Sequence, residues 1–184
     1  MRLQACVKID QVSEDGEAVT VVNKMSDSFV QNFMRALVCS FNGTALVAVV
    51  DTGGVGRSVS FAGTIPVAAM GGQAYFGAVI GSAGAATVGS EFALGSQIQH
   101  GSGSGTLMYS DVTITPTTVD GSNIEFAIRR SFVNLTESPQ TVCELGIVAR
   151  HSGYNILILR DVFDPIEIPP NGGVAASVVI RTVI

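Results

Sequence analysis

The stretch LMYSDVTITPTTVDGSNIEFAIRRSFV, residues 107–133, decides the fold class because it contains two alternating runs joined by a turn. Apolar and polar residues alternate over 107–115 and again over 123–133, which is the period of a half-buried β-strand. The Asp120-Gly121 pair between the two runs is typical of a hairpin turn. The stretch therefore predicts two antiparallel strands.

The second run loses its alternation near the end. Ile124, Phe126 and Ile128 lie on one face, but Arg129 and Arg130 then follow one another. Two adjacent charged residues in such a run predict a β-bulge that turns one arginine outward.

The rest of the chain repeats this β pattern with one exception. Short runs rich in Val, Ile, Thr and Phe are divided by Gly, Asn, Asp and Pro. The exception is residues 26–40, where apolar residues recur at spacings of three and four after Ser26, a residue type that caps helices. The other strands are expected at 3–12, 17–23, 45–50, 58–61, 75–80, 95–100, 141–150, 155–163 and 174–184.

The order of these elements predicts a mainly β fold in a single domain over residues 1–184. No βαβ rhythm and no break in composition divides the chain. We expect a β-sandwich of jelly-roll or Greek-key type with one short helix near residues 26–40. We also expect residues 1–12 to act as an N-terminal arm that reaches a neighbouring subunit.

Charged residues are scarce, at 14% of the 184 residues against about 25% in an ordinary soluble domain. Ten basic and fifteen acidic residues give a net charge of −5. So few cations argue against a nucleic-acid binder that neutralises phosphates. The apolar content of 47% excludes a disordered chain.

Residues 58–90 contain no charged residue at all. The segment is long enough to span a bilayer, but Pro66 and Gly71-Gly72 break it into short pieces. We therefore expect no membrane segment, and we interpret residues 58–90 as a surface that other subunits cover. Residues 1–8 lack the apolar core of a signal peptide, so we expect folding in a cytoplasm.

The strongest catalytic motif is Asp51-Thr52-Gly53, which follows an apolar run. It resembles the active-site loop of aspartic proteases, a family in which two such loops supply two carboxylates that share one proton. A single copy here would require a homodimer. Gly54 stands where that family usually has Ala or Ser, and the same residues are also ordinary turn chemistry.

Other chemical motifs are weaker. The glycine-rich loops at 51–56, 81–89 and 101–105 lack the Lys-Ser/Thr pair of a phosphate-binding loop. The two histidines, His100 and His151, lie beside turn glycines and are interpreted as solvated turn residues.

Acidic and sulfur side chains give no clear metal pattern. Asp161, Asp164 and Glu167 could hold a hard cation such as calcium or belong to strand-end turns, and the sequence leaves both readings open. Cys6, Cys39 and Cys143 are odd in number and form no CxxC, which favours reduced thiols. We expect no catalytic, cofactor or metal site.

Several short motifs follow one another in the last third of the chain. VCELGIV at 142–148 is followed by LILRDVF at 157–163, by PIEIPPNGG at 165–173 and by a last apolar strand. Earlier in the chain, the helix expected around 29–37 is followed by DTGG at 51–54. This order of elements resembles that of structural proteins of tailed bacteriophages. The resemblance implies a β-rich virion component, such as a head decoration or cement protein or a tail part, that assembles as a symmetric oligomer.

Together these observations predict a non-enzymatic virion structural protein, a capsid decoration or cement protein that stabilises the shell through contacts between subunits. Its partners would be copies of itself, for example in a trimer, and other virion proteins such as the major capsid protein, with assembly in the host cytoplasm. The alternatives are a tail or fibre component, a carbohydrate-binding β-sandwich and a dimeric aspartic protease that uses Asp51. The lack of tryptophan and the scatter of Tyr75, Tyr109 and Tyr154 along the chain argue against carbohydrate binding, which Tyr154 would have to carry.

Overall fold

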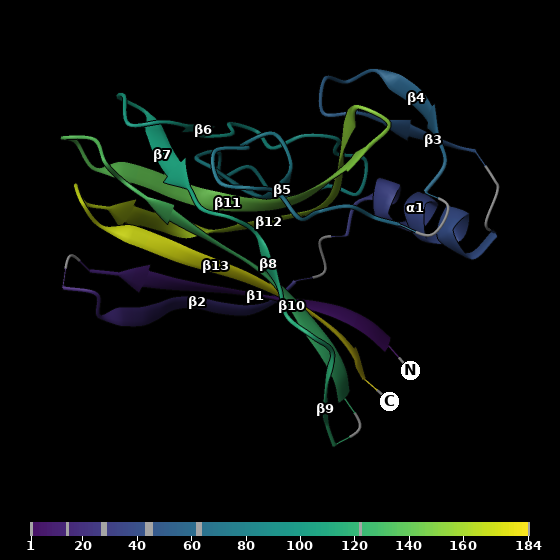
Figure 1. Ribbon diagram of the computed structural model, residues 1–184, viewed down its shortest axis with the longest axis horizontal. Coiled ribbons are helices and arrows are strands. Elements are labelled where there is room, and N and C mark those ends of the chain that lie inside the picture. Colours follow the sequence, from purple (N-terminus) through teal and green to yellow (C-terminus); the bar gives the residue numbers. More distant parts are fainter. Residues whose placement is uncertain are drawn as a thin grey trace.

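The computed structural model describes residues 2–13, 15–26, 29–42, 46–61, 64–121 and 123–183. Over these residues the chain is mainly β with one helix, and several sheets pack together, as the sequence predicted (Figure 1). In the described part, no helix has the length and apolar character needed to cross a membrane. The elements in chain order are β1 (Arg2–Val12), β2 (Ala18–Ser26), α1 (Gln31–Asn42), β3 (Val47–Val50), β4 (Gly56–Val59), β5 (Gly77–Gly81), β6 (Gln99–His100), β7 (Thr106–Tyr109), β8 (Thr113–Ile114), β9 (Thr118–Asp120), β10 (Asn123–Val133), β11 (Gln140–His151), β12 (Tyr154–Ile168) and β13 (Gly173–Val183).

Two sheets form the main layers. The long sheet has the strand order β2-β1-β13-β10-β7-β6, and β8 and β9 also pair with β10. The second sheet has the order β12-β11-β5, and Figure 1 shows it over one face of the long sheet. The β3–β4 hairpin and α1 lie together at one end of the second sheet, where α1 contacts β12 and β3. The β-sandwich prediction is confirmed at this level, whereas the jelly-roll or Greek-key type stays a prediction.

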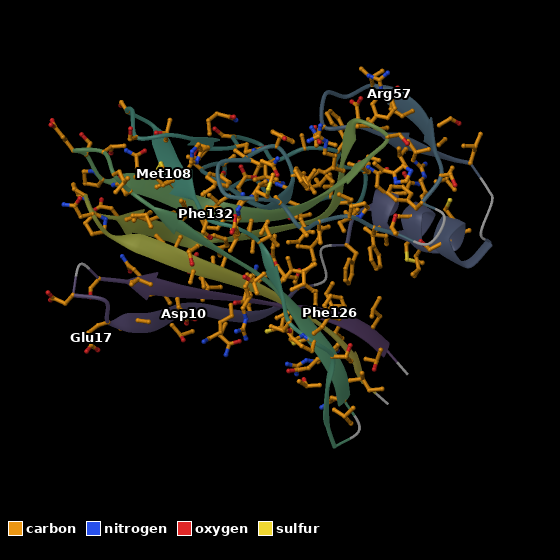
Figure 2. The ribbon with its side chains drawn as sticks, in the orientation of Figure 1. Asp10, Glu17, Arg57, Met108, Phe126 and Phe132 are labelled. Atoms are coloured by element: carbon orange, nitrogen blue, oxygen red, sulfur yellow. The ribbon has the colours of Figure 1, made fainter. Side chains whose placement is uncertain are left out.

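The core lies between the two sheets. Because side chains alternate between the faces of a strand, every second residue of β1, β10 and β13 points toward the second sheet. Ile9, Val178 and Phe132 are fully buried from the long sheet, and Leu145 and Leu157 are fully buried from the second. Figure 2 shows Phe132 between the two layers.

The N-terminal run is a central strand and not an arm. β1 pairs along its whole length with β13, starting with Arg2 opposite Val183, and it pairs with β2 on its other side. The expectation of an arm at residues 1–12 is therefore wrong for residues 2–12, while residue 1 lies outside the described part. Its partner β13 lies at the opposite end of the chain, so no local sequence pattern could reveal the pairing.

Helix α1 begins later than predicted. Ser26 is the last residue of β2 and not a helix cap, and residues 27 and 28 lie outside the described part. Phe29 forms a β-bridge with Leu159, and the Val30 N–H donates to the Ile158 carbonyl at 3.2 Å. These contacts hold the chain extended beside β12, so the helix cannot start before residue 31.

Strand β10 passes both arginines without a bulge. It pairs continuously with β13, with Arg129 opposite Ser177 and Arg130 opposite Ala176. Ordinary alternation therefore places Arg129 on the exposed face and Arg130 on the buried face. The predicted bulge is wrong, but one arginine does point outward.

Much of the charge-free segment 58–90 lies in the chain's own core. β5 is buried at all five positions, and Phe61, Val67 and Phe76 are buried as well. The local shortage of charge therefore has an intramolecular cause. The expected contact with other subunits stays a prediction for the exposed residues of this segment, which include Met70, Tyr75 and Val88.

Candidate functional site

Asp51, the candidate protease residue, organises the turn between β3 and β4. Its Oδ1 accepts hydrogen bonds from the backbone N–H groups of Gly53 and Val55, both at 3.0 Å. Its Oδ2 accepts from Arg57 Nε at 2.7 Å. The hydrogen bond from Arg57, helped by the Val55 N–H, lowers the pKa of the Asp51 carboxyl below its usual value. Both oxygens are engaged within the hairpin, which is the arrangement of a turn carboxylate.

The tyrosines do not form a shared platform. Tyr109 is buried, and burial raises its pKa to about 12. Tyr75 and Tyr154 are more exposed, and each is covered by an arginine: Arg150 lies 4.8 Å from the centre of the Tyr75 ring, and Arg57 lies 4.4 Å from that of Tyr154. Stacking a sugar on either ring would require the arginine to move.

The histidines take part in packing. His100 Nδ1 accepts a hydrogen bond from the Tyr109 N–H at 3.1 Å, and the His151 ring lies 5.2 Å from that of Phe61. Each residue ends a strand and is only half-exposed, so the interpretation as solvated turn residues holds in part.

The acidic residues near 161 do not form a metal centre. Asp161 is buried and its Oδ1 pairs with Lys24 Nζ at 2.5 Å, while Asp164 and Glu167 are exposed. β12 runs through Pro165 to residue 168, so the expected strand-end turn is in fact continuous strand. In the described part of the chain, no group of three or more His, Cys, Asp or Glu side chains could hold a metal ion.

Cys6, Cys39 and Cys143 are all reduced and outside any disulfide bond, as the sequence predicted. Burial raises the pKa of the Cys143 thiol above its usual value, which keeps it protonated and unreactive at neutral pH.

A buried ion pair that the sequence did not reveal fixes the loop between β5 and β6. The Glu144 carboxylate is fully buried and accepts from Arg160 Nε at 2.8 Å. It also accepts from the backbone N–H groups of Ala83, Gly95 and Ser96, at 3.2, 3.0 and 2.8 Å. Arg160 pairs in turn with Glu91 in the same loop. A Cβ at Gly81 would collide with the Glu144 carboxylate, so the close approach depends on glycine there.

Arg130 is a second buried charged residue. Its hydrogen-bond partners are backbone carbonyl oxygens and not a carboxylate. Its guanidinium lies 4.8 Å from the centre of the Tyr109 ring. Burial lowers its pKa, yet a guanidinium stays charged at any physiological pH. Its inward position in the alternating run of β10 was the one sequence signal for burial. The five donors reach the carbonyls of Ser110 (2.8 Å), Phe76 (3.1 Å), Ala78 (3.0 Å), Met70 (3.0 Å) and Gln73 (2.9 Å).

The candidate functional site is an overhang, the end of the long sheet that extends past the second sheet. It consists of the start of β1, the end of β13, the start of β10, and β9. Figure 1 shows these strand ends running away from β11 and β12, and Figure 2 shows Phe126 at this end of β10.

Residues that lie opposite one another on neighbouring strands form rows across the inner face of the long sheet, and the rows become less buried toward the overhang. Val7, Val178 and Ile128 face one another across three strands, and each is at most 3% exposed. Two rows further out, the facing residues become exposed. In this outer row Leu3 is 41% exposed, Ile124 42% and Val119 73%, with Thr182 half-exposed between Leu3 and Ile124.

The other face of the overhang is polar. Arg181 and Glu125 lie opposite each other on it and form an ion pair at 3.2 Å. The overhang is therefore an amphipathic β-ribbon. The second sheet covers the inner face over the rest of the long sheet but does not extend over the apolar face of the overhang. Sequence alternation predicted which residues share this face but could not show where the second sheet ends.

Comparisons of the chain with protein-family models, with curated proteins and with solved structures found no match.

Proposed function

We propose that this chain is a non-enzymatic structural protein that assembles with other subunits through the apolar face of the overhang. The observation that carries the proposal is the exposed row of Leu3, Ile124 and Val119, which continues a fully buried face of the same sheet. A sheet face of this kind contributes free energy only when something covers it.

The energy available at one overhang is modest. Covering a half-exposed Leu, Ile or Val side chain contributes about 1 kcal/mol, so the row supplies roughly 3 kcal/mol. One such contact makes a weak complex, whereas many of them repeated by symmetry hold a shell together. This favours a protein that acts in many copies.

The roles of the buried polar and charged residues fit the same proposal. Asp51 holds a hairpin turn, and Glu144 and Arg160 fix a loop. Arg130 holds five carbonyls. Each is used for the fold, which fits a protein that functions through its surface. The resemblance to tailed-bacteriophage proteins leads us to place it in a virion, as a capsid decoration or cement protein.

The test is association with particles. Virions of the phage whose genome encodes the chain are sedimented, and the chain is counted on stained gels. A decoration protein is expected in hundreds of copies, a tail part in far fewer, and absence from the virion would refute the placement.

A variant tests the overhang itself. Val119→Lys puts a charge on the most exposed apolar residue of the row and should weaken binding to particles stripped of the chain. Leu46→Lys is the matched control, because Leu46 is 68% exposed just before β3, outside both the overhang and residues 58–90. Equal binding by the two variants would refute the role of the overhang.

A further inference from the structure

A groove of about 960 Å³ runs along one side of the β-sandwich, between β2 of the long sheet and β12 of the second sheet. Residues 21–24 of β2 line one wall, and residues 162–167 of β12 line the other. This volume lies at the upper end of the range for pockets that hold small ligands. The groove is therefore large enough for a short extended segment of another chain.

Neither wall offers a continuous ladder to an added strand. In β2, Val21 has no partner on β1, because the register of the two strands shifts there. In β12, residues 163–165 have no partner on β11, and Pro165 has no N–H to donate. Bulges of this kind protect the edge of a sheet against strand addition. An occupant of the groove must therefore be held mainly through its side chains.

The groove carries uncompensated negative charge. Its lining includes one cation, Lys24, whose Nζ is already paired with the buried Asp161 at 2.5 Å and donates to the Val162 carbonyl. Even so, Asp161 Oδ2 is buried without a hydrogen-bond partner in the described structure. Asp164 and Glu167 are exposed in the lining, and their side chains form no ion pair or hydrogen bond with any described residue. The groove therefore attracts cations that the described part of the chain does not supply.

The apolar part of the lining suits the stems of long basic side chains. Val22, Phe163 and Ile166 line the same groove. Lysine and arginine lay their methylene groups along such surface while the charged end stays in water. Apolar walls also strengthen the field of carboxylates within a groove. A metal ion would gain nothing from these walls, and the described residues contain no group of three acidic, His or Cys side chains that could hold one.

We propose that the groove between β2 and β12 binds an extended basic segment of another protein, which presents one lysine or arginine to Asp164 and another to Glu167. The two acidic residues are three positions apart on β12, so their Cα atoms are at most about 11 Å apart. Basic residues at alternate positions of an extended segment share one face and lie about 7 Å apart. Their long stems can span the difference.

This surface is separate from the overhang, with which it shares no residue. The inference therefore goes beyond the proposed function and does not depend on the placement of the chain in a virion.

Fluorescence anisotropy with a labelled nine-residue peptide of alternating lysine and serine tests the proposal on the full chain. The peptide should bind, and it should bind more weakly as the salt concentration rises, because the contacts are exposed ion pairs. A peptide of alternating glutamate and serine should not bind. The proposal is overturned if the lysine peptide does not bind at about 1 mM chain in low salt, or if both peptides bind equally.

Variants test the two carboxylates. Asp164→Asn combined with Glu167→Gln should raise the dissociation constant of the lysine peptide roughly tenfold. The matched control is Glu17→Gln combined with Glu137→Gln, which makes the same change in net charge at two exposed residues outside the groove; Figure 2 shows Glu17 at the end of the β1–β2 hairpin. Equal weakening by the two pairs would show that the peptide responds only to net charge, which overturns the proposal. Urea unfolding of each variant checks that the fold is kept.

Amide hydrogen exchange locates the bound peptide. The peptide should slow exchange at residues 21–24 and 162–167 and leave the β9 amides unchanged. Protection elsewhere, with none along the groove, would overturn the proposal. Val119→Lys should leave peptide binding intact, so the peptide assay and the virion assay report on the two proposals separately.

Discussion

Replacing Arg130 by methionine should destabilise the whole domain, because its guanidinium donates to five backbone carbonyls within 3.1 Å. Methionine fills similar space but donates no hydrogen bond. A buried carbonyl that loses its partner costs about 1–3 kcal/mol. If two of the five recover a water molecule, the remaining three still predict a loss of about 3–9 kcal/mol. That is a large part of the roughly 5–15 kcal/mol that stabilises a typical domain.

Urea unfolding followed by circular dichroism measures this loss. The matched control is Arg129→Met, because Arg129 is the next residue on the same strand and lies on the exposed face. The control should stay within about 0.5 kcal/mol of wild type. Arg130→Lys should fall between wild type and Arg130→Met, since an ammonium has only three donors. The reasoning is refuted if Arg130→Met and Arg129→Met unfold at the same urea concentration.

Three further outcomes are expected. Glu144→Gln removes the carboxylate that pairs with the buried Arg160, so it should lower the free energy of unfolding in urea by about 3–5 kcal/mol. Amide exchange over residues 82–97 should become faster, because Glu144 accepts hydrogen bonds from backbone N–H groups of this loop. Unchanged exchange there would contradict the proposal that Glu144 holds the loop. The pKa of Tyr109 is raised from 10.0 to about 12 in the folded chain, so the protonated hydroxyl stabilises the fold fully below pH 10, and about 2–3 kcal/mol of the free energy of unfolding is lost as the pH rises toward 12. Tyr109→Phe should lack this part of the alkaline loss of stability. Identical curves of unfolding free energy against pH for the two proteins would refute the assignment. Deleting residues 2–12 removes a central strand and should prevent folding, so a deletion variant that is soluble and unfolds cooperatively would contradict the pairing of β1 with β13.

The strands were largely predictable because their signals are local. Alternation over 123–133 marked β10 with its correct bounds, and the turn residues near Gly121 separated it from the preceding strands. The helix was located to within a few residues, but its start was set by the bridge between Phe29 and Leu159, which are 130 positions apart. A capping residue such as Ser26 cannot compete with a β-ladder that holds the same segment.

The chemical motifs predicted function less well than the alternation predicted strands, because a short motif does not determine the tertiary contacts of its residues. Asp-Thr-Gly at 51–53 is compatible with a catalytic loop or a turn, and the hydrogen bonds to Asp51 favour the turn. Glu144 and Arg160 carry no motif at all. The pairing of β11 with β12 brings them together, and the loop between β5 and β6 packs over them.

By itself the sequence determined that this chain is mainly β, where most strands lie and which residues share a face, since these depend on neighbours along the chain. Only the tertiary structure decided that β1 is central, that Arg130 is buried among carbonyls and that the outer row at Leu3, Ile124 and Val119 is uncovered. These features depend on which distant strands pair and on where the second sheet stops. The period of a strand shows which side of a sheet a residue faces, and the opposing layer decides whether that side is core or surface.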